Sequence, residues 1–181
     1  VHTLPNVEKK NIHITKGIHN IIKVDAPQGN LKLELEGSIE RYLPTTIVRK
    51  AGSLKTLNVQ DFGKSDKYIV GKYDLEVLTL PRIKLYDVEI KQSSTNTIKV
   101  PASGAVTFTK LGTGFGSIYE DDGQKLNWVC NLNNTLQTEV IYLQPGKYKA
   151  VFRYEFAKES LKTVERNFIV NSSSVLKVSL N

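Results

Sequence analysis

The sequence has few of the residues that form disulfides, charge clusters or membrane spans. Cys130 is the only cysteine in 181 residues, which excludes a disulfide within the chain. No apolar run approaches the roughly 18 residues that a membrane-spanning helix requires, so we expect no membrane span. Methionine is absent and the first residue is Val1, so we expect a piece of a longer protein whose targeting signal, if it has one, lies elsewhere.

The charge of the chain is not concentrated either. There are 25 Lys and Arg against 18 Asp and Glu, for a net charge of +7. The longest basic clusters are the pairs Lys9-Lys10 and Arg49-Lys50, whereas nucleic-acid-binding proteins gather basic side chains into a patch with stacking aromatics. We therefore interpret the basic residues as solvated faces of strands and expect no nucleic-acid partner.

The chain does contain an internal repeat. Three motifs occur twice: Thr3-Leu4-Pro5 and Thr79-Leu80-Pro81, Ile22-Lys23-Val24 and Ile98-Lys99-Val100, and Gly71-Lys72-Tyr73 and Gly146-Lys147-Tyr148. The first two pairs lie 76 residues apart and the third pair lies 75 residues apart. A repeat of that length predicts two units, each able to bury a modest core of its own.

The repeated unit consists of strands. Leucines alternate with polar residues over Leu31–Leu35, and the same rhythm returns over Val106–Thr109, as expected for half-buried strands. About seven short apolar stretches per unit are separated by Gly, Asn, Asp, Ser and Pro, a spacing typical of a β-sandwich. The best helical candidate, Glu155–Glu165, is predicted to form at most a short turn. We predict an all-β chain of two tandem Ig-like or prealbumin-like β-sandwich repeats.

The repeat also predicts domain boundaries. We expect one β-sandwich over residues 29–101 and a second over 102–181. Residues 1–28 read as a hairpin with strands at Asn11–Ile14 and Asn20–Val24, and they correspond to the last hairpin of an upstream repeat. In the alternative, this hairpin packs on the first domain. Within the units, we match three pairs of strands: Ile39–Tyr42 with Ile118-Tyr119, Thr46–Val48 with Leu126–Cys130, and Leu57–Val59 with Val140–Tyr142.

Four stretches carry a resemblance to a known family: IVRKAG (47–52), KYIVGKYDLEVLTLPR (67–82), GSIYEDDGQKLNWVCNL (116–132) and LQPGKYKAVFR (143–153). With the pattern Gly-x-Tyr-x-x-x-Val, they resemble the PEGA-type and transthyretin-like repeats of bacterial envelope proteins. They are most similar to repeats that follow a von Willebrand factor A domain in some surface or periplasmic proteins. The resemblance covers essentially the whole chain, and its motifs are structural.

The resemblance implies a non-catalytic β-sandwich array behind an adhesion-type or metal-dependent ligand-binding domain. It also implies a periplasmic or cell-surface location and a protein partner. The metal-binding motif of the A domain, Asp-x-Ser-x-Ser, occurs nowhere in the chain, so none of that domain's functional residues is carried over.

The histidines do not predict a metal site. His13 and His19 lie across the first predicted hairpin and Asp25 follows, but a structural zinc site uses four ligands and no cysteine is close in sequence. His13 lies between Ile12 and Ile14, which places it on the solvent face. We expect exposed side chains there and at His2, and no metal.

Cys130 is predicted to be a core residue. Alternation places Leu126, Trp128 and Cys130 on one inward face. A catalytic cysteine needs a base within hydrogen-bonding reach, and all histidines precede residue 20. We therefore expect no catalytic residue, no cofactor and no enzymatic activity.

Three loop segments have sequences that are found in binding sites of other proteins. The acidic cluster Glu120–Gly123 fits a solvated hairpin tip with Asp122-Gly123 at the turn, and it lacks the ligand spacing of a calcium loop. The glycine-rich stretch Gly112–Gly116 is predicted to be a loop that turns the chain, because no helix follows it to hold a phosphate. The Asp-Phe-Gly at 61–63 is a chance match to a kinase motif, because the chain has none of the other kinase motifs.

The favoured function is a structural and binding array, and the alternative is a carbohydrate-binding module. A carbohydrate-binding module needs exposed aromatics on one face, whereas Trp128 and the tyrosines at 42, 68, 119 and 142 are predicted to point mostly inward. The sequence does not identify the binding residues.

Overall fold

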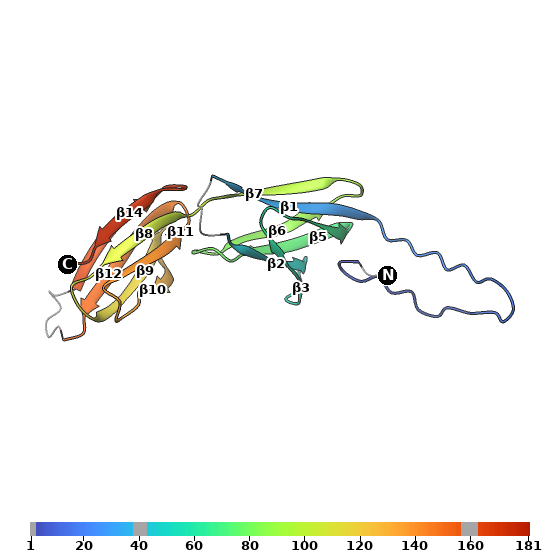
Figure 1. Ribbon diagram of the computed structural model, residues 1–181, viewed down its shortest axis with the longest axis horizontal. Helices are drawn as coiled ribbons and strands as arrows, with labels where there is room; N and C mark the ends of the chain where they lie inside the picture. Colours follow the sequence, from blue (N-terminus) through green and yellow to red (C-terminus); the bar gives the residue numbers. More distant parts are fainter. Residues whose placement is uncertain (1–2, 38–42, 157–162) are drawn as a thin grey trace. The chain divides into compact units, whose positions relative to one another are not determined.

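A computed structural model describes residues 3–37, 43–156 and 163–181 of the chain. All regular elements in those ranges are β-strands, and there are fourteen of them (Figure 1). The described residues accordingly contain no helix that would cross a membrane. The predicted all-β class and the two sandwiches of about seven strands are confirmed.

The chain divides into two units. Unit 1 contains Val1–Glu34, Thr45–Val77 and Lys84–Lys99, and unit 2 contains Leu35–Pro44, Leu78–Ile83 and Val100–Asn181. The segment Leu78–Ile83, which joins the fifth strand to the sixth, thus belongs to unit 2 although strands of unit 1 flank it.

The first seven strands build the sandwich of unit 1. They are β1 (Gln28–Glu36), β2 (Thr45–Lys50), β3 (Thr56–Asp61), β4 (Ser65–Ile69), β5 (Gly71–Val77), β6 (Ile83–Ile90) and β7 (Thr95–Pro101). One sheet has the order β4-β1-β7 and the other has the order β3-β2-β5-β6. Fully buried side chains from both sheets, among them Leu31, Leu33, Val48, Tyr68 and Ile90, form the core.

The next seven strands repeat this order in unit 2. They are β8 (Gly104–Thr109), β9 (Gly114–Asp121), β10 (Leu126–Asn131), β11 (Thr138–Leu143), β12 (Gly146–Tyr154), β13 (Thr163–Val170) and β14 (Val175–Ser179). The sheets have the orders β11-β8-β14 and β10-β9-β12-β13, with β14 parallel to β8. The core contains Val106, Phe108, Ile118, Tyr148 and Phe152.

The predicted pairing of strands between the units was wrong in its middle part. Val48 pairs with Leu75 as Ile118 pairs with Ala150, so β2 corresponds to β9 and not to β10. By the same order β3 corresponds to β10 and β4 to β11. The strand β4 was not predicted, because its surroundings are polar and Tyr68 is its only buried residue. The predicted strand Ile39–Tyr42 lies outside the described residues, as does most of Glu155–Glu165.

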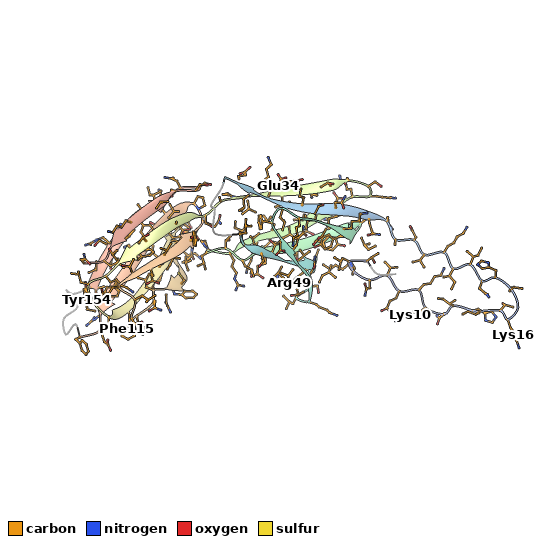
Figure 2. All side chains as sticks on the ribbon, in the orientation of Figure 1. Lys10, Lys16, Glu34, Arg49, Phe115 and Tyr154 are labelled. Carbon is orange, nitrogen blue, oxygen red and sulfur yellow. The ribbon has the colours of Figure 1, made fainter. Side chains whose placement is uncertain are left out.

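The predicted hairpin strands near the N-terminus do not form in this chain. Residues 3–27 contain no strand, and Figure 1 draws them as a plain trace before β1. Lys10 and Lys16 are exposed there (Figure 2). The physical reason is that an isolated two-stranded hairpin is marginally stable in water without further strands to cover it.

Candidate functional site

The first functional feature is a turn that occurs identically in both units. In unit 1 the hydroxyl of Thr3 donates to the carbonyl of Pro5 at 2.6 Å, and in unit 2 the hydroxyl of Thr79 donates to the carbonyl of Pro81 at 2.7 Å. These bonds close each Thr-Leu-Pro segment on itself. The carbonyl of the central leucine is then directed at the sandwich.

Each turn is bound to its sandwich by the same backbone hydrogen bond, and a tyrosine hydroxyl bonds to the residue that donates it. The Leu4 carbonyl accepts from the amide of Ile69 at 2.8 Å, and the Leu80 carbonyl accepts from the amide of Gln144 at 2.7 Å. The carbonyls of Ile69 and Gln144 accept in turn from the hydroxyls of Tyr73 at 2.6 Å and Tyr148 at 2.7 Å. We call each Thr-Leu-Pro turn with its tyrosine a junction anchor.

Burial shapes the chemistry of the anchor tyrosines. Both rings lie in the cores, where Tyr73 is 2% exposed and Tyr148 is 1% exposed. Burial raises the pKa of Tyr73 and, more strongly, that of Tyr148 above the ordinary value, because the charged phenolate is poorly solvated there. The tyrosines therefore remain neutral donors at physiological pH and have a structural role.

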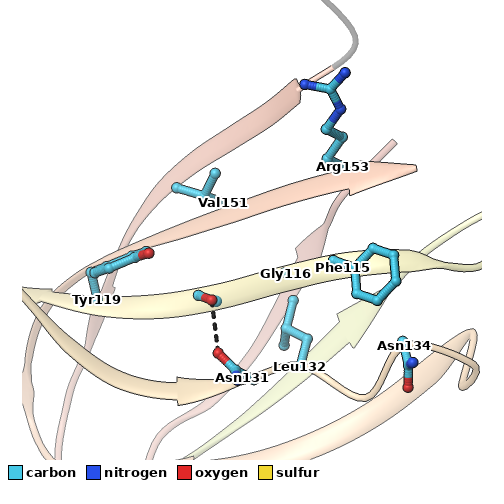
Figure 3. Close-up of a pocket in the computed structure, with 9 residues that line it drawn as sticks. Phe115, Gly116, Tyr119, Asn131, Leu132, Asn134, Val151 and Arg153 are labelled. Carbon is cyan, nitrogen blue, oxygen red and sulfur yellow. Dashed lines mark hydrogen bonds between the residues drawn. The ribbon is translucent and has the colours of Figure 1, made fainter. Parts of the chain in front are cut away.

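The second feature is a pocket on the outer face of the sheet β10-β9-β12-β13 in unit 2. It has a volume of about 500 Å³. Side chains of β9 and β12 line it, together with residues at and just after the end of β10: Phe115, Ser117, Tyr119, Asn131, Leu132, Asn134, Val151 and Arg153, with Gly116 in the floor (Figure 3). Phe115 and Asn134 lie at one end, and Tyr119 lies at the other.

Asn131 organises the edge of this pocket. Its Oδ1 accepts a hydrogen bond from the hydroxyl of Ser117 at 2.8 Å and another from Nε1 of Trp128 at 3.0 Å. The indole is thereby held in one position while its ring stays 61% exposed. Phe115 is 63% exposed on the same face of the sheet. Two exposed aromatic rings close to amide and guanidinium groups have the chemical composition that suits polar ligands with an apolar face.

A buried ion pair supports the loop that carries Asn134. The side chain of Lys110 is fully buried and its Nζ lies 3.1 Å from Oε1 of Glu139. Lys110 also donates to the carbonyl of Asn133, whose amide donates to both carboxylate oxygens of Glu139. These bonds fix the loop after β10, and the Asn134 carbonyl accepts from the amide of Gly114.

The predicted inward position of Trp128 was wrong. A β-bulge between Trp128 and Cys130 shifts the register of β10 against β9, so that Val129 points inward and is 8% exposed. Leu126, at 44% exposed, lies outward with Trp128. Cys130 is half-buried, and burial raises the pKa of its thiol to about 11, so it is a thiol and not a nucleophilic thiolate at neutral pH.

The four tyrosines weighed in the sequence divide into different classes. Tyr68 is fully buried as predicted. Tyr119 and Tyr142 are half-buried, and Tyr119 lines the outer pocket. Tyr42 lies outside the described residues. Of the pocket residues, sequence reasoning had missed Phe115, Asn131 and Arg153. The alternation of Phe115, Ser117 and Tyr119 against the buried Ile118 was the signal for an outer face.

In the described part of the chain, the histidines and Asp25 form no metal site. His13 and His19 are exposed on the segment before β1, and His2 lies outside the described residues. Within the described ranges no group of three His, Cys, Asp or Glu side chains is placed to hold a metal ion. Asp25 is exposed as well.

The acidic cluster is a hairpin tip whose carboxylates bond to their own turn. Oδ1 of Asp122 accepts from the amides of Gln124 and Lys125, and Oδ2 accepts from the side chain of Asn127. The bond from the Lys125 amide is the main reason why the pKa of Asp122 is lowered. The glycine-rich stretch was predicted to be a loop, but Gly114 and Gly116 lie in β9. A Cβ at Gly114 would collide with β12, and one at Gly116 would collide with the side chain of Leu132.

Comparisons with known proteins do not identify a family. No protein-family model and no curated protein matches the chain. Among solved structures, it is similar to the Bacillus anthracis TIE protein, with 14% sequence identity over 86% of this chain and a TM-score of 0.34. The chain spans 34% of the length of that chain. A likeness of this strength assigns no role.

Proposed function

We propose that this chain is a non-catalytic repeat region of a larger bacterial envelope protein, located in the periplasm or at the cell surface. It extends or presents an upstream ligand-binding domain of the von Willebrand factor A type. The single observation that supports this most is the junction anchor. Two sandwiches that share little sequence keep the same turn, the same accepting carbonyl and the same tyrosine.

The anchor explains how an array of such units is built. The turn that docks on unit 2 comes from the segment between β5 and β6, which are strands of unit 1. Each repeat in this scheme contributes a turn to the next repeat before it completes its own sandwich.

Fractionation of cells that produce the parent protein tests the proposed location. An antibody raised against residues 29–181 is expected to detect the protein in the periplasmic or surface fraction, and external protease is expected to remove a surface-exposed form. The gene upstream of Val1 should encode a secretion signal and an Asp-x-Ser-x-Ser domain. A parent protein confined to the cytosol, or fused to an enzyme, would contradict the proposal.

A second candidate function, carbohydrate binding, is supported by the outer face of unit 2. Sugar rings present apolar C–H faces that stack on aromatic rings, while their hydroxyls bond to amides and charged groups. The pocket offers both kinds of group, since the exposed ring of Phe115 lines it together with Asn131 and Arg153. At its edge, the exposed indole of Trp128 donates to Asn131.

An oligosaccharide array with neutral and acidic glycans tests this candidate. Trp128→Ala is expected to weaken binding of any ligand by at least about tenfold, because one stacked ring is lost. Tyr86→Ala is the matched control, since Tyr86 is an exposed aromatic of unit 1 and 67% exposed. Absence of glycan binding, or equal losses in both variants, would exclude this surface as the carbohydrate site.

A further inference from the structure

The segment before β1 exposes an unusual amount of apolar surface. Five isoleucines between residues 12 and 22 are exposed: Ile12 44%, Ile14 69%, Ile18 63%, Ile21 75% and Ile22 44%. We call residues 6–25 the N-terminal arm. A contiguous group of exposed apolar side chains of this kind marks a surface that another element covers.

The N-terminal arm corresponds residue by residue to the hairpin β6–β7. A shift of 76 residues aligns Val7–Ile14 with β6 and His19–Asp25 with β7, and the junction anchors at Thr3 and Thr79 keep the same shift. The exposed fraction of the side chain then differs sharply between equivalent positions of the arm and the hairpin. Ile90 is fully buried, whereas its counterpart Ile14 is 69% exposed.

The backbone of the arm carries the same unusual dihedral angles as that hairpin. Asn11 has φ 57° and its counterpart Asp87 has φ 55°. At the tip, Gly17 has φ 82°, and Ser93 and the equivalent Ser173 have φ 54° and 57°. Positive φ is uncommon outside glycine. The arm therefore has the local backbone shape of the β6–β7 hairpin, although its two halves are not paired as strands.

Side-chain bonds close the tip of the arm. Thr15 donates its amide to Oδ1 of Asn20, and Nδ2 of Asn20 donates to the carbonyl of Thr15, both at 2.9 Å. Farther from the tip, Nζ of Lys9 donates to the carbonyl of Lys23 at 2.7 Å. The two halves of the arm are thus held as a hairpin without strand pairing.

Unit 1 offers the arm no vacant place of the corresponding kind. In a finished unit the sixth strand pairs with the fifth and the seventh with the first, and in unit 1 these positions are taken by β6 and β7. Unit 2 is filled in the same way by β13 and β14. A second copy of this chain has the same occupied positions.

We propose that the N-terminal arm supplies the sixth and seventh strands of a preceding β-sandwich repeat. Val7–Ile14 pairs with the fifth strand of that repeat, and His19–Asp25 lies beside its first strand. This rests on the repeat architecture of the proposed function and not on its cellular location.

The two complete units indicate what the preceding repeat must present. The amide of Asn30 in β1 donates to the Ser94 carbonyl at 2.7 Å, and the amide of Ala105 in β8 donates to the Ser174 carbonyl at 2.8 Å. Glycine stands just before each donor, because a Cβ at Gly29 or Gly104 would collide with the end of the sixth strand of its unit. The partner of the arm therefore has a glycine at the start of its first strand.

A hybrid chain tests the proposal, with residues 27–76 inserted before Val1 so that strands β1–β5 precede the arm. Backbone hydrogen exchange is compared between the hybrid and the full 181-residue chain. Amides of 7–14 and 19–25 are expected to exchange at least about a hundredfold more slowly in the hybrid, at the level of β6 and β7. In the 181-residue chain they are expected to exchange freely.

Two variants and one control hybrid make the test decisive. Ile14→Asp is expected to abolish the protection, because its counterpart Ile90 is fully buried, whereas Lys10→Glu is expected to keep it, because its counterpart Tyr86 is exposed. The control hybrid carries residues 83–101 in place of 7–25. If this control is protected and the arm is not, the proposal is wrong.

Protection of the arm in the 181-residue chain that increases with concentration would assign it to a second copy and also overturn the proposal. A cytosolic parent protein would contradict the proposed function alone, since the exchange experiment does not depend on the compartment.

Discussion

On the outer face of the sheet β3-β2-β5-β6, Arg49 and Glu76 of unit 1 form an ion pair of 2.8 Å. The equivalent positions in unit 2 hold Tyr119 and Val151, and Ile47 is replaced by Ser117. A hollow of unit 1 that Arg49 and Glu76 line has a volume of about 210 Å³, whereas the pocket of unit 2 has a volume of about 500 Å³. The inner faces and the junction anchors stay alike. The two units thus share what builds the sandwich and differ on the outer face.

The polar cores of the two units also differ. Unit 1 contains a buried tyrosine, Tyr68, whose hydroxyl donates to Gln60 at 2.9 Å and accepts from Asn58 at 2.8 Å, and Asn58 also donates to the carboxylate of Asp66. Unit 2 contains the charged pair of Lys110 and Glu139. A buried charge left without its partner is more costly than a neutral group, so unit 2 is expected to be the more sensitive to single substitutions.

The largest effect is expected for Lys110→Ala. Removing the buried ammonium leaves Glu139 unpaired and should destabilise unit 2 by about 3–5 kcal/mol. Urea unfolding followed by the fluorescence of Trp128, the only tryptophan, measures unit 2. The double variant Lys110→Met with Glu139→Leu should lose much less stability. Equal losses in the single and double variants would mean that the pair is not the cause.

The next effect is expected for Gly29→Ala and Gly104→Ala. The added Cβ would lie 2.0 Å from the Lys91 carbonyl oxygen in unit 1 and 2.5 Å from Cγ1 of Val170 in unit 2. We expect each variant to lose about 1–3 kcal/mol of unfolding free energy, measured by thermal or urea unfolding. Gly123→Ala has no neighbour within 4 Å, so its cost comes from its positive φ alone. A loss of stability in only one unit would show that the hairpins β6–β7 and β13–β14 are not equivalent.

A smaller effect is expected for Tyr73→Phe and Tyr148→Phe. Each variant removes the hydroxyl that donates to the carbonyl of Ile69 or Gln144, the residue whose amide binds the anchor turn. We expect a cost of about 1 kcal/mol, similar in the two units. Urea unfolding followed by far-UV circular dichroism measures both. No loss in either unit would show that the hydroxyl bonds do not hold the anchors.

High pH is expected to weaken both units through their buried tyrosines. Burial raises the pKa of Tyr68 to about 12 and raises that of Tyr148 further, whereas tyrosine in an unfolded chain ionises near pH 10. The unfolded state therefore loses protons first, so the stabilisation is complete below about pH 10 and is lost as the pH rises through the folded pKa. Urea midpoints between pH 8 and 12 measure this decline, and Tyr68→Phe should make it shallower. If the urea midpoint of that variant fell with pH as steeply as that of the unchanged protein, the decline could not be assigned to Tyr68.

The smallest effect on stability is expected for Phe115→Ser and Trp128→Ser. Both rings are more than half exposed, so stability should change by less than about 0.5 kcal/mol. Circular dichroism melting measures this. A large loss would show that these rings support the fold and are not available for a ligand.

The fold could be predicted from the sequence because alternation and turn residues determine it. Leu31 and Leu33 alternate with polar residues, and the corresponding rhythm at Val106 and Phe108 makes the repeat visible. The short strand β4 could not be predicted, since one buried tyrosine among polar residues gives no period. The β-bulge at Trp128 could not be predicted either, and it reverses which side chains of β10 face outward.

The candidate pocket could not be predicted from the sequence for a related reason. It depends on Tyr119 and Val151, which stand where the other unit has an ion pair, and this comparison requires the correct strand pairing. The junction anchor was seen as a repeated Thr-Leu-Pro and a repeated Gly-Lys-Tyr. Only the structure joins these two motifs through the carbonyls of Leu4 and Leu80.

The most direct measurement of the central claim is residue-resolved hydrogen exchange in the parent protein, with whatever sequence naturally precedes Val1. The account predicts that amides of 7–14 and 19–25 exchange as slowly as those of β6 and β7, and that the Ile69 amide is protected like that of Gln144. Fast exchange of the N-terminal arm beside a folded preceding domain would contradict the account, because the arm would then complete no repeat.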